Sequence, residues 1–279
     1  DKLLPDEYWP KLREIPEPPE YLWVRGTLPA PERKIVTIVG SRKMSQYGKD
    51  VVDHLVSGLA DYPVTIVSGM ALGIDGAVHR AAMKYGLPTI AFPGSGLHDD
   101  ALYPATHKWL AQEILASGGA LVSEFPPEEK GRVHFFPKRN RIMVGVSDAV
   151  VVIEAGVRSG TLITARLTVD YNRELLCVPH SNFSEGGAGG HIFMKLGAAP
   201  WRSASDLLEA VGIVEEKNME TLSLTSEEEE VLALLAEPIS RDELIRGIGL
   251  PTGDANVLLA QMEIRGLIAE SLGNIRKLV

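Results

Sequence analysis

The sequence has few of the features that mark secreted or membrane proteins. It contains a single cysteine, Cys177, so a disulfide within the chain is excluded and a reducing compartment is expected. No apolar run approaches the roughly eighteen residues that a transmembrane helix needs. No signal-peptide pattern opens the chain, which begins at Asp1. We therefore expect a cytoplasmic protein that does not engage a membrane.

Motifs for metal binding, nucleotide cofactors and catalysis are also missing. The seven histidines form neither an HExxH pair nor a Cys/His cluster, so no metal site is predicted. The GxGxxG fingerprint and the Walker lysine motif are absent, which argues against a nicotinamide cofactor and against ATP. His79, His98 and His134 have no evident catalytic partner in the sequence. The pattern predicts a binding protein without cofactor, and not an enzyme.

Basic residues are scarce overall but concentrated in one place. The formal net charge of −9 disfavours nucleic acid as a partner. Between residues 130 and 141, however, the chain carries basic side chains and no carboxylate: Lys130, Arg132, His134, Lys138, Arg139 and Arg141. A local basic patch, and not the overall charge, sets the affinity for phosphate groups. A nucleic-acid partner therefore remains open.

Short apolar runs alternate with amphipathic stretches from residue 35 onward. Strands are predicted at 35–39, 64–67, 88–92, 120–122, 149–153 and 175–178. Helices are predicted near 45–60, 71–85, 105–116, 138–145, 160–171 and 203–211. This alternation is typical of an α/β, Rossmann-like fold with a mostly parallel sheet, here over residues 35–212. Residues 1–34, rich in proline and aromatics, are expected to form an extended lead-in packed on that domain.

The last part of the chain has a different pattern. Residues 213–224 are polar and predict a linker, and residues 225–279 predict three helices and a hairpin, a small winged-helix-like domain. Residues 222–279 hold five Lys and Arg against ten Asp and Glu. This balance favours contact with protein, or a structural role, over reading a DNA groove.

Ligand-like residues follow several predicted strands, and parallel sheets bind ligands at the carboxyl ends of their strands. Gly40, Ser41 and Arg42 follow the first strand and are candidates for a phosphate contact. Ser68 and Gly69 follow the second strand, where small residues precede a helix whose N–H groups suit an anion; a turn with Asp75 capping that helix is the alternative. After the fifth strand, Ser159, Gly160 and Thr161 precede another helix, beside Arg158 as a further candidate cation. A plain surface arginine is the alternative there.

The segment HFFPKRNRIM combines cations with aromatic rings, as single-strand binding sites do. Lys138, Arg139 and Arg141 are the predicted phosphate contacts, with Asn140 between them, and Phe135 is a predicted stacking partner for bases. For the aromatic pair, and above all for Phe136, a buried structural role is the alternative.

In their order along the chain, these segments resemble the DprA/Smf family of DNA-processing proteins. The resemblance covers residues 8–212 and rests on IVGSRK, IVSGMALGIDGAVHRAA, ALVSEFPP, FPKRNRIM, DAVVVIEA and RSGTLITARLT. It implies an extended Rossmann fold, a homodimer formed through that domain, and single-stranded DNA held in a basic pocket. It also implies that RecA recombinase is loaded on incoming DNA in natural transformation.

Two other functions fit the same loops. A nucleotide phosphoribohydrolase shares the strand-to-glycine turn near Glu154, although this chain lacks the double glycine of those enzymes and has an added arginine, Arg158. A nucleotide-sensing module would bind mononucleotides tightly and oligomers poorly.

Overall fold

The continuous Val/Ile/Leu runs form the centre of a nine-stranded sheet in the computed structural model, which describes residues 1–157, 159–213, 225–235, 238–265, 267–271 and 273–277. The sheet order is β1-β2-β6-β5-β4-β3-β7-β8-β9. The parallel strands are β3 (Lys34–Val39), β4 (Val64–Ser68), β5 (Thr89–Ala91), β6 (Ala120–Ser123), β7 (Ala149–Val152), β8 (Glu174–Cys177) and β9 (Ala199–Pro200). The predicted α/β fold with a mostly parallel sheet is confirmed.

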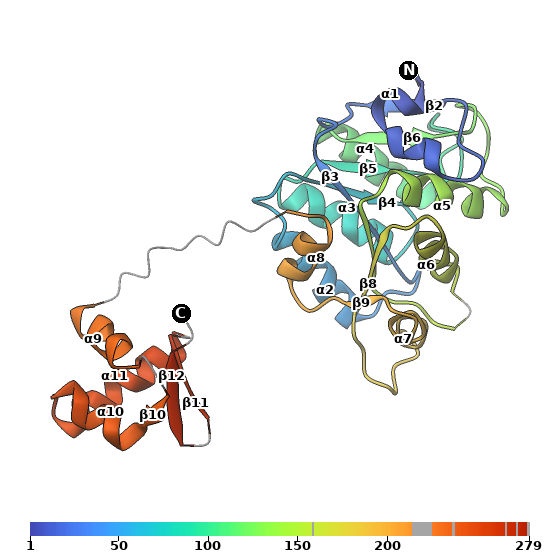
Figure 1. Cartoon of the computed structure of the whole chain (residues 1–279). Helices are drawn as coiled ribbons and strands as arrows, with labels where there is room; N and C mark the ends of the chain where they lie inside the picture. The colour runs from blue at the N-terminus through green and yellow to red at the C-terminus, as the bar shows by residue number, and fades with distance from the viewer. Residues whose placement is uncertain (158, 214–224, 236–237, 266, 272, 278–279) are drawn as a thin grey trace. The chain divides into compact units, whose positions relative to one another are not determined.

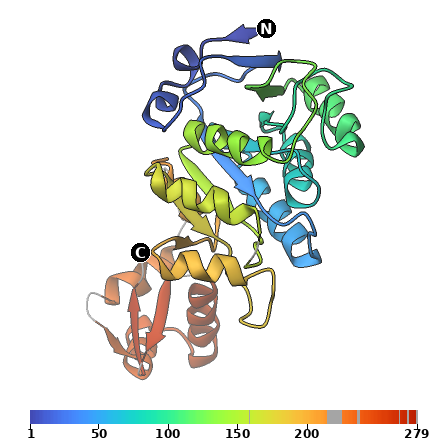
Figure 2. The same cartoon turned by 90° about the vertical axis from the view of Figure 1, so that its right-hand side faces the viewer.

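Helices cover both faces of this sheet (Figures 1 and 2). One face is packed by α2 (Gln46–Ser57), α3 (Ile74–Lys84) and α8 (Ala204–Ala210). The other is packed by α5 (Phe135–Val146), α6 (Thr161–Asp170) and α7 (Ala188–Lys195), which follow one another along it in green to gold in Figure 2. Helix α4 (Lys108–Ala116) packs on β5 and β6 through a separate apolar cluster. The short 3-10 helix η2 (Ala105–His107) precedes it.

Strand β3 shows why an uninterrupted apolar run is needed here. Val36 and Ile38 face the first helix layer, whereas Ile35 and Val39 face the second. Because successive side chains of a strand point to opposite faces, a strand covered on both sides must be apolar at every position. The exception, Thr37, is fully buried and its hydroxyl lies 2.6 Å from the Ser147 hydroxyl.

The first 34 residues are more ordered than an extended lead-in. Strand β1 (Lys2–Leu3) pairs with β2 (Leu22–Gly26), and β2 pairs antiparallel with β6, beside which Figure 1 shows it. Between them lie α1 (Pro5–Tyr8) and the 3-10 helix η1 (Pro10–Glu14), from which Trp9 and Leu12 enter the core. The segment packs on the main domain as expected, but it does so by extending the sheet.

The chain divides into two compact units, Asp1–Glu215 and Glu216–Val279. The second contains α9 (Ser226–Leu234), β10 (Ile239–Ser240), α10 (Arg241–Ile248), α11 (Thr252–Ile264), β11 (Ile268–Ser271) and β12 (Asn274–Lys277). Its three helices, antiparallel hairpin and separate apolar core are those of a winged-helix domain. All of the predicted linker except Ile213 lies outside the described residues, as does Gly266.

Thr225 begins α9 with a capping box, in which its side chain and that of Glu228 each bond the other's backbone N–H. Of the helices that the structure describes, none is both long enough and apolar enough to cross a membrane. Over the same residues, no three His, Cys, Asp or Glu side chains gather as metal ligands would.

Candidate nucleic-acid interface

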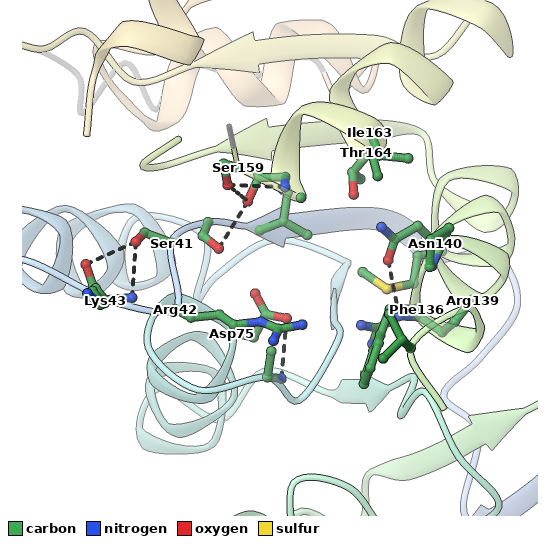
Figure 3. Close-up of a pocket in the computed structure, with 18 residues that line it drawn as sticks. Ser41, Arg42, Lys43, Asp75, Phe136, Arg139, Asn140, Ser159, Ile163 and Thr164 are labelled. Atoms are coloured by element: carbon green, nitrogen blue, oxygen red, sulfur yellow. Dashed lines mark hydrogen bonds between the residues drawn. The ribbon is translucent and has the colours of Figure 1, made fainter. Parts of the chain in front are cut away.

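A cavity of about 500 Å³ opens at the carboxyl end of the sheet, where β3 lies between β4 and β7 (Figure 3). The loops after β3 and β7 lead to helices on opposite faces, so a crevice forms at this switch in strand order. Its wall comes from the β3 loop, from α5 and from the start of α6. The lining residues include Gly40, Ser41, Arg42, Lys43, Asp75, Phe136, Arg139, Asn140, Met143, Ser159, Gly160, Thr161, Ile163 and Thr164.

Asp75, in the first turn of α3, ties the loops around the cavity together. Its carboxylate is buried and accepts hydrogen bonds from the backbone N–H groups of Ala71, Gly40 and Gly69. Burial raises the pKa of Asp75, while the positive charge of Arg139 and these hydrogen bonds act in the opposite direction. Asp75 is therefore more than a helix cap, because it holds the ends of two strands at fixed positions.

Arg139 is a buried cation and not a free phosphate ligand. Only 6% of the residue is exposed, and its Nη1 donates to the carbonyl oxygens of Gly69, at 2.5 Å, and Phe92. Burial lowers the pKa of Arg139 to about 10. A Cβ on Gly69 would lie 2.3 Å from this guanidinium, so Gly69 makes room for it. Arg139 lines the cavity and lends it positive charge, but its Nη1 already bonds the protein backbone and its Nε bonds the Asn140 side chain.

Arg42 and Phe136 form the exposed, ligand-facing pair. The guanidinium carbon of Arg42 lies 5.3 Å from the centroid of the half-buried Phe136 ring. The predicted stacking residue, Phe135, is instead buried, with its ring parallel to that of Phe125 at 3.8 Å. The prediction for Phe135 is therefore wrong. The helical period identifies the better candidate, because Phe136, Asn140 and Met143 share one face of α5.

Four other predicted contacts lie outside the cavity lining: Ser68, Gly69, Lys138 and Arg141. The Ser68 hydroxyl is fully buried and donates to the Ile38 carbonyl at 2.7 Å. Arg141 forms an ion pair with Glu124 at 2.5 Å, and Lys138 is exposed but does not line the cavity. Consecutive positions on a helix point in different directions, which separates Lys138 and Arg141 from Asn140.

The start of α6 fastens the β7 loop to the β3 loop. The Ser159 hydroxyl accepts from the Thr161 N–H at 3.2 Å, and the Thr161 hydroxyl donates to the Gly40 carbonyl at 3.1 Å. The Leu162 and Ile163 N–H groups bond within the turn. Ser159, Gly160 and Thr161 line the cavity and remain predicted contacts. Arg158 lies outside the described residues.

The conformation of the loop after β3 accounts for its residue types, Gly40 to Lys43. A Cβ on Gly40 would lie 2.6 Å from Ile74, so glycine permits the close approach of this loop to α3. The Ser41 hydroxyl bonds the backbone of Lys43 at 3.0 Å in both directions, as donor and acceptor, which shapes a turn that exposes Arg42 and Lys43. Cations on one side and a ring on the other suit a ligand with both phosphate groups and aromatic bases.

Comparison with known proteins agrees with this arrangement. Residues 3–212 match the family model described as DNA recombination-mediator protein A, and residues 215–274 match the DprA winged helix domain. The chain is 40% identical to protein Smf of Escherichia coli over 202 residues, 72% of this chain and 54% of that protein, so it spans about half of that relative's length. It is 39% identical to the DNA processing protein DprA of Bacillus subtilis, over 72% of this chain and 67% of that one.

Two solved structures are similar to the larger unit. DNA processing protein A from Streptococcus pneumoniae superposes with a TM-score of 0.66 and 35% identity, over 71% of this chain and 69% of that one. The Helicobacter pylori protein, whose structure concerns its single-stranded DNA binding mode, gives a TM-score of 0.63 and 26% identity, over 72% and 91% of the two chains.

Proposed function

Because the chain belongs to the DprA/Smf family of DNA recombination-mediator proteins, we propose that it binds single-stranded DNA in the cavity between β3, α5 and α6. In this proposal the protein is not an enzyme and acts by holding the strand. A single-stranded DNA binding mode in the Helicobacter pylori relative supports this ligand.

The observation that carries the proposal is the Arg42–Phe136 pair. An exposed guanidinium attracts the DNA phosphates, and the half-buried Phe136 ring, which contacts Arg42 and Tyr103, lines the cavity where an unpaired base would lie. Bases in a duplex are stacked on one another, so their faces do not reach such a ring. The pair therefore favours single strands over duplex DNA and tolerates many sequences.

The most direct test of the strand preference compares two adjacent phenylalanines. We expect labelled single-stranded oligonucleotides to bind at least tenfold more tightly than the matching duplex in fluorescence anisotropy titrations. Phe136→Leu should weaken single-strand binding about fivefold or more, since stacking on an aromatic ring contributes about 1–3 kcal/mol per base. Phe135→Leu, with a buried ring, is the control that should bind as wild type does. Equal affinity for single and double strands would contradict the proposal.

The finer biological role is the loading of RecA recombinase on the bound strand in natural transformation, by a homodimer formed through the larger unit. Exposed Ile192 and Leu196 on α7 support a self-association surface there, since Phe193 between them is buried. Ile192→Asp should shift the protein toward monomer in sedimentation velocity.

For the loading of RecA, wild type should speed the assembly of RecA filaments on single-stranded DNA. Filament growth at an unchanged rate would remove this part of the proposal.

A further inference from the structure

The α5 wall of the cavity combines one aromatic ring with one amide. Phe136 and Asn140 are four residues apart on this helix, so both side chains lie on the face that lines the cavity. Met143, one turn further along α5, is 1% exposed and also lines the cavity. Arg42 and Lys43 belong to the β3 loop on another side of the cavity. A base that stacks on Phe136 would therefore place its edge near the Asn140 amide.

A hydrogen bond from the neighbouring Arg139 fixes the orientation of the Asn140 side-chain amide. Arg139 Nε donates a hydrogen bond to Asn140 Oδ1 at 3.2 Å. A guanidinium has no acceptor, so the group facing it must be the amide oxygen and not the NH2 group. Arg139 is itself held by the Gly69 and Phe92 carbonyls and does not turn away. Figure 3 shows the Asn140 oxygen turned toward Arg139 and the nitrogen toward the cavity.

The NH2 group of Asn140 is thus a donor presented to the ligand. Over the described part of the chain, no residue accepts a hydrogen bond from it. We propose that Asn140 makes this cavity selective for bases with a carbonyl on their edge, thymine above all, and disfavours adenine. This inference rests on the proposed single-strand binding and adds a base preference to it.

Adenine is disfavoured because of the donors and acceptors on its edge. Asparagine recognises adenine with two bonds, in which its oxygen accepts from the adenine amino group while its NH2 donates to a ring nitrogen. In this cavity the oxygen is turned toward Arg139, so the NH2 donor is the group of Asn140 that faces the base. The adenine amino group would then face another donor. Thymine offers carbonyl oxygens instead, and either of them accepts from the Asn140 NH2 group.

The test uses labelled decamers in which one central nucleotide carries thymine or adenine and all other positions are abasic. Abasic neighbours remove stacking within the DNA, which would otherwise favour free adenine tracts. We expect wild type to bind the thymine decamer about five- to tenfold more tightly than the adenine decamer, the effect of one hydrogen bond. In Asn140→Ala the ratio should fall to about one through weaker thymine binding. Arg42→Ala, the control in the same cavity, should weaken both decamers and keep the ratio.

The outcomes separate this inference from the proposed function. If wild type binds both decamers equally, or if Asn140→Ala weakens them by the same factor, Asn140 contacts the backbone and the base preference is wrong, while single-strand binding stands. If wild type binds neither these decamers nor oligothymidine, the proposed function itself fails. The wild-type ratio needs no variant, and Asn140→Ser repeats the test if the alanine variant does not fold.

Discussion

At the scale of single residues, burial decides which cation meets the ligand. From the sequence, four cations are equally good candidates for phosphate contacts, but their surroundings differ: Arg42, Lys138, Arg139 and Arg141. Arg139 bonds backbone carbonyls, Arg141 pairs with Glu124, and Arg42 is exposed over the Phe136 ring. A buried arginine whose Nη1 and Nε bond the protein shapes the site, whereas an exposed arginine is available to phosphate groups. Substitution of Arg139 is therefore expected to lower the stability of the fold, whereas substitution of Arg42 is expected to weaken DNA binding.

Arg139→Ala should reduce the stability of the larger unit. The change leaves the Asp75 carboxylate buried without its neighbouring positive charge, and it leaves two backbone carbonyls without a donor. Each buried acceptor left without its donor costs about 1–3 kcal/mol, so the loss of both carbonyl contacts should cost about 2–6 kcal/mol. Urea unfolding followed by circular dichroism measures the loss. Arg42→Ala, at an exposed position, should change the free energy of unfolding by less than about 0.5 kcal/mol. Equal stability of the two variants would contradict the structural role of Arg139.

At the scale of elements, periodicity predicted the fold better than the site. Six parallel strands and the helices between them follow from apolar runs and their spacing. The two N-terminal strands do not, because prolines interrupt the pattern and β2 is defined by its pairing with β1 and β6. In the segment FFPKRNR, residue types indicated binding, but α5 begins at Phe135 rather than at residue 138. The residue at which α5 begins decides that Phe135 faces Phe125 and that Phe136 faces the cavity. Tertiary packing, which the sequence pattern does not reveal, determines where the helix begins.

The packing of α3 on β5 predicts a specific dependence of stability on pH. His79 on α3 is fully buried, with Nδ1 2.8 Å from the Thr89 hydroxyl, and burial lowers its pKa to about 3. In the unfolded chain a histidine has a pKa of about 6.5, so only the unfolded state takes up a proton between pH 6.5 and 3. Acidification therefore destabilises the fold, and between pH 7 and pH 5 His79 alone should remove about 2 kcal/mol.

The measurement compares urea unfolding of wild type and His79→Gln at these two pH values. The variant loses stability at pH 7, but the difference between it and wild type should narrow by about 2 kcal/mol at pH 5. His98→Gln, at an exposed position, is the control and should leave the pH dependence unchanged. A constant difference between His79→Gln and wild type would show that His79 titrates alike in both states.

At the scale of the whole molecule, charge is divided between the two units. Residues 222–279 have five Lys and Arg against ten Asp and Glu. Within that unit Arg241 pairs with Glu263 and Glu270, and Arg265 pairs with Glu228, so two of its five cations are already paired with carboxylates. On α11, the helix that would enter a DNA groove in other winged-helix proteins, Val257 and Ile264 are exposed. We expect this face to contact protein.

Ending the chain after Ile213 should therefore leave single-strand binding nearly intact. The larger unit has its own apolar cores and holds every residue of the cavity. The shortened protein is expected to bind a labelled single-stranded oligonucleotide within about twofold of the full chain, because the removed residues carry net negative charge. A loss of tenfold or more would assign a DNA contact to the winged-helix unit.

The central claim, that phosphate groups meet Arg42 at the mouth of this cavity, is tested most directly by the salt dependence of single-strand binding. The logarithm of the association constant is plotted against the logarithm of salt concentration for wild type, for Arg42→Ala and for Arg202→Ala, an exposed arginine outside the cavity. Each lost phosphate contact should lower the slope by about 0.7 for a single strand. We expect this change, with weaker binding, for Arg42→Ala alone. A wild-type slope and affinity in Arg42→Ala would contradict it.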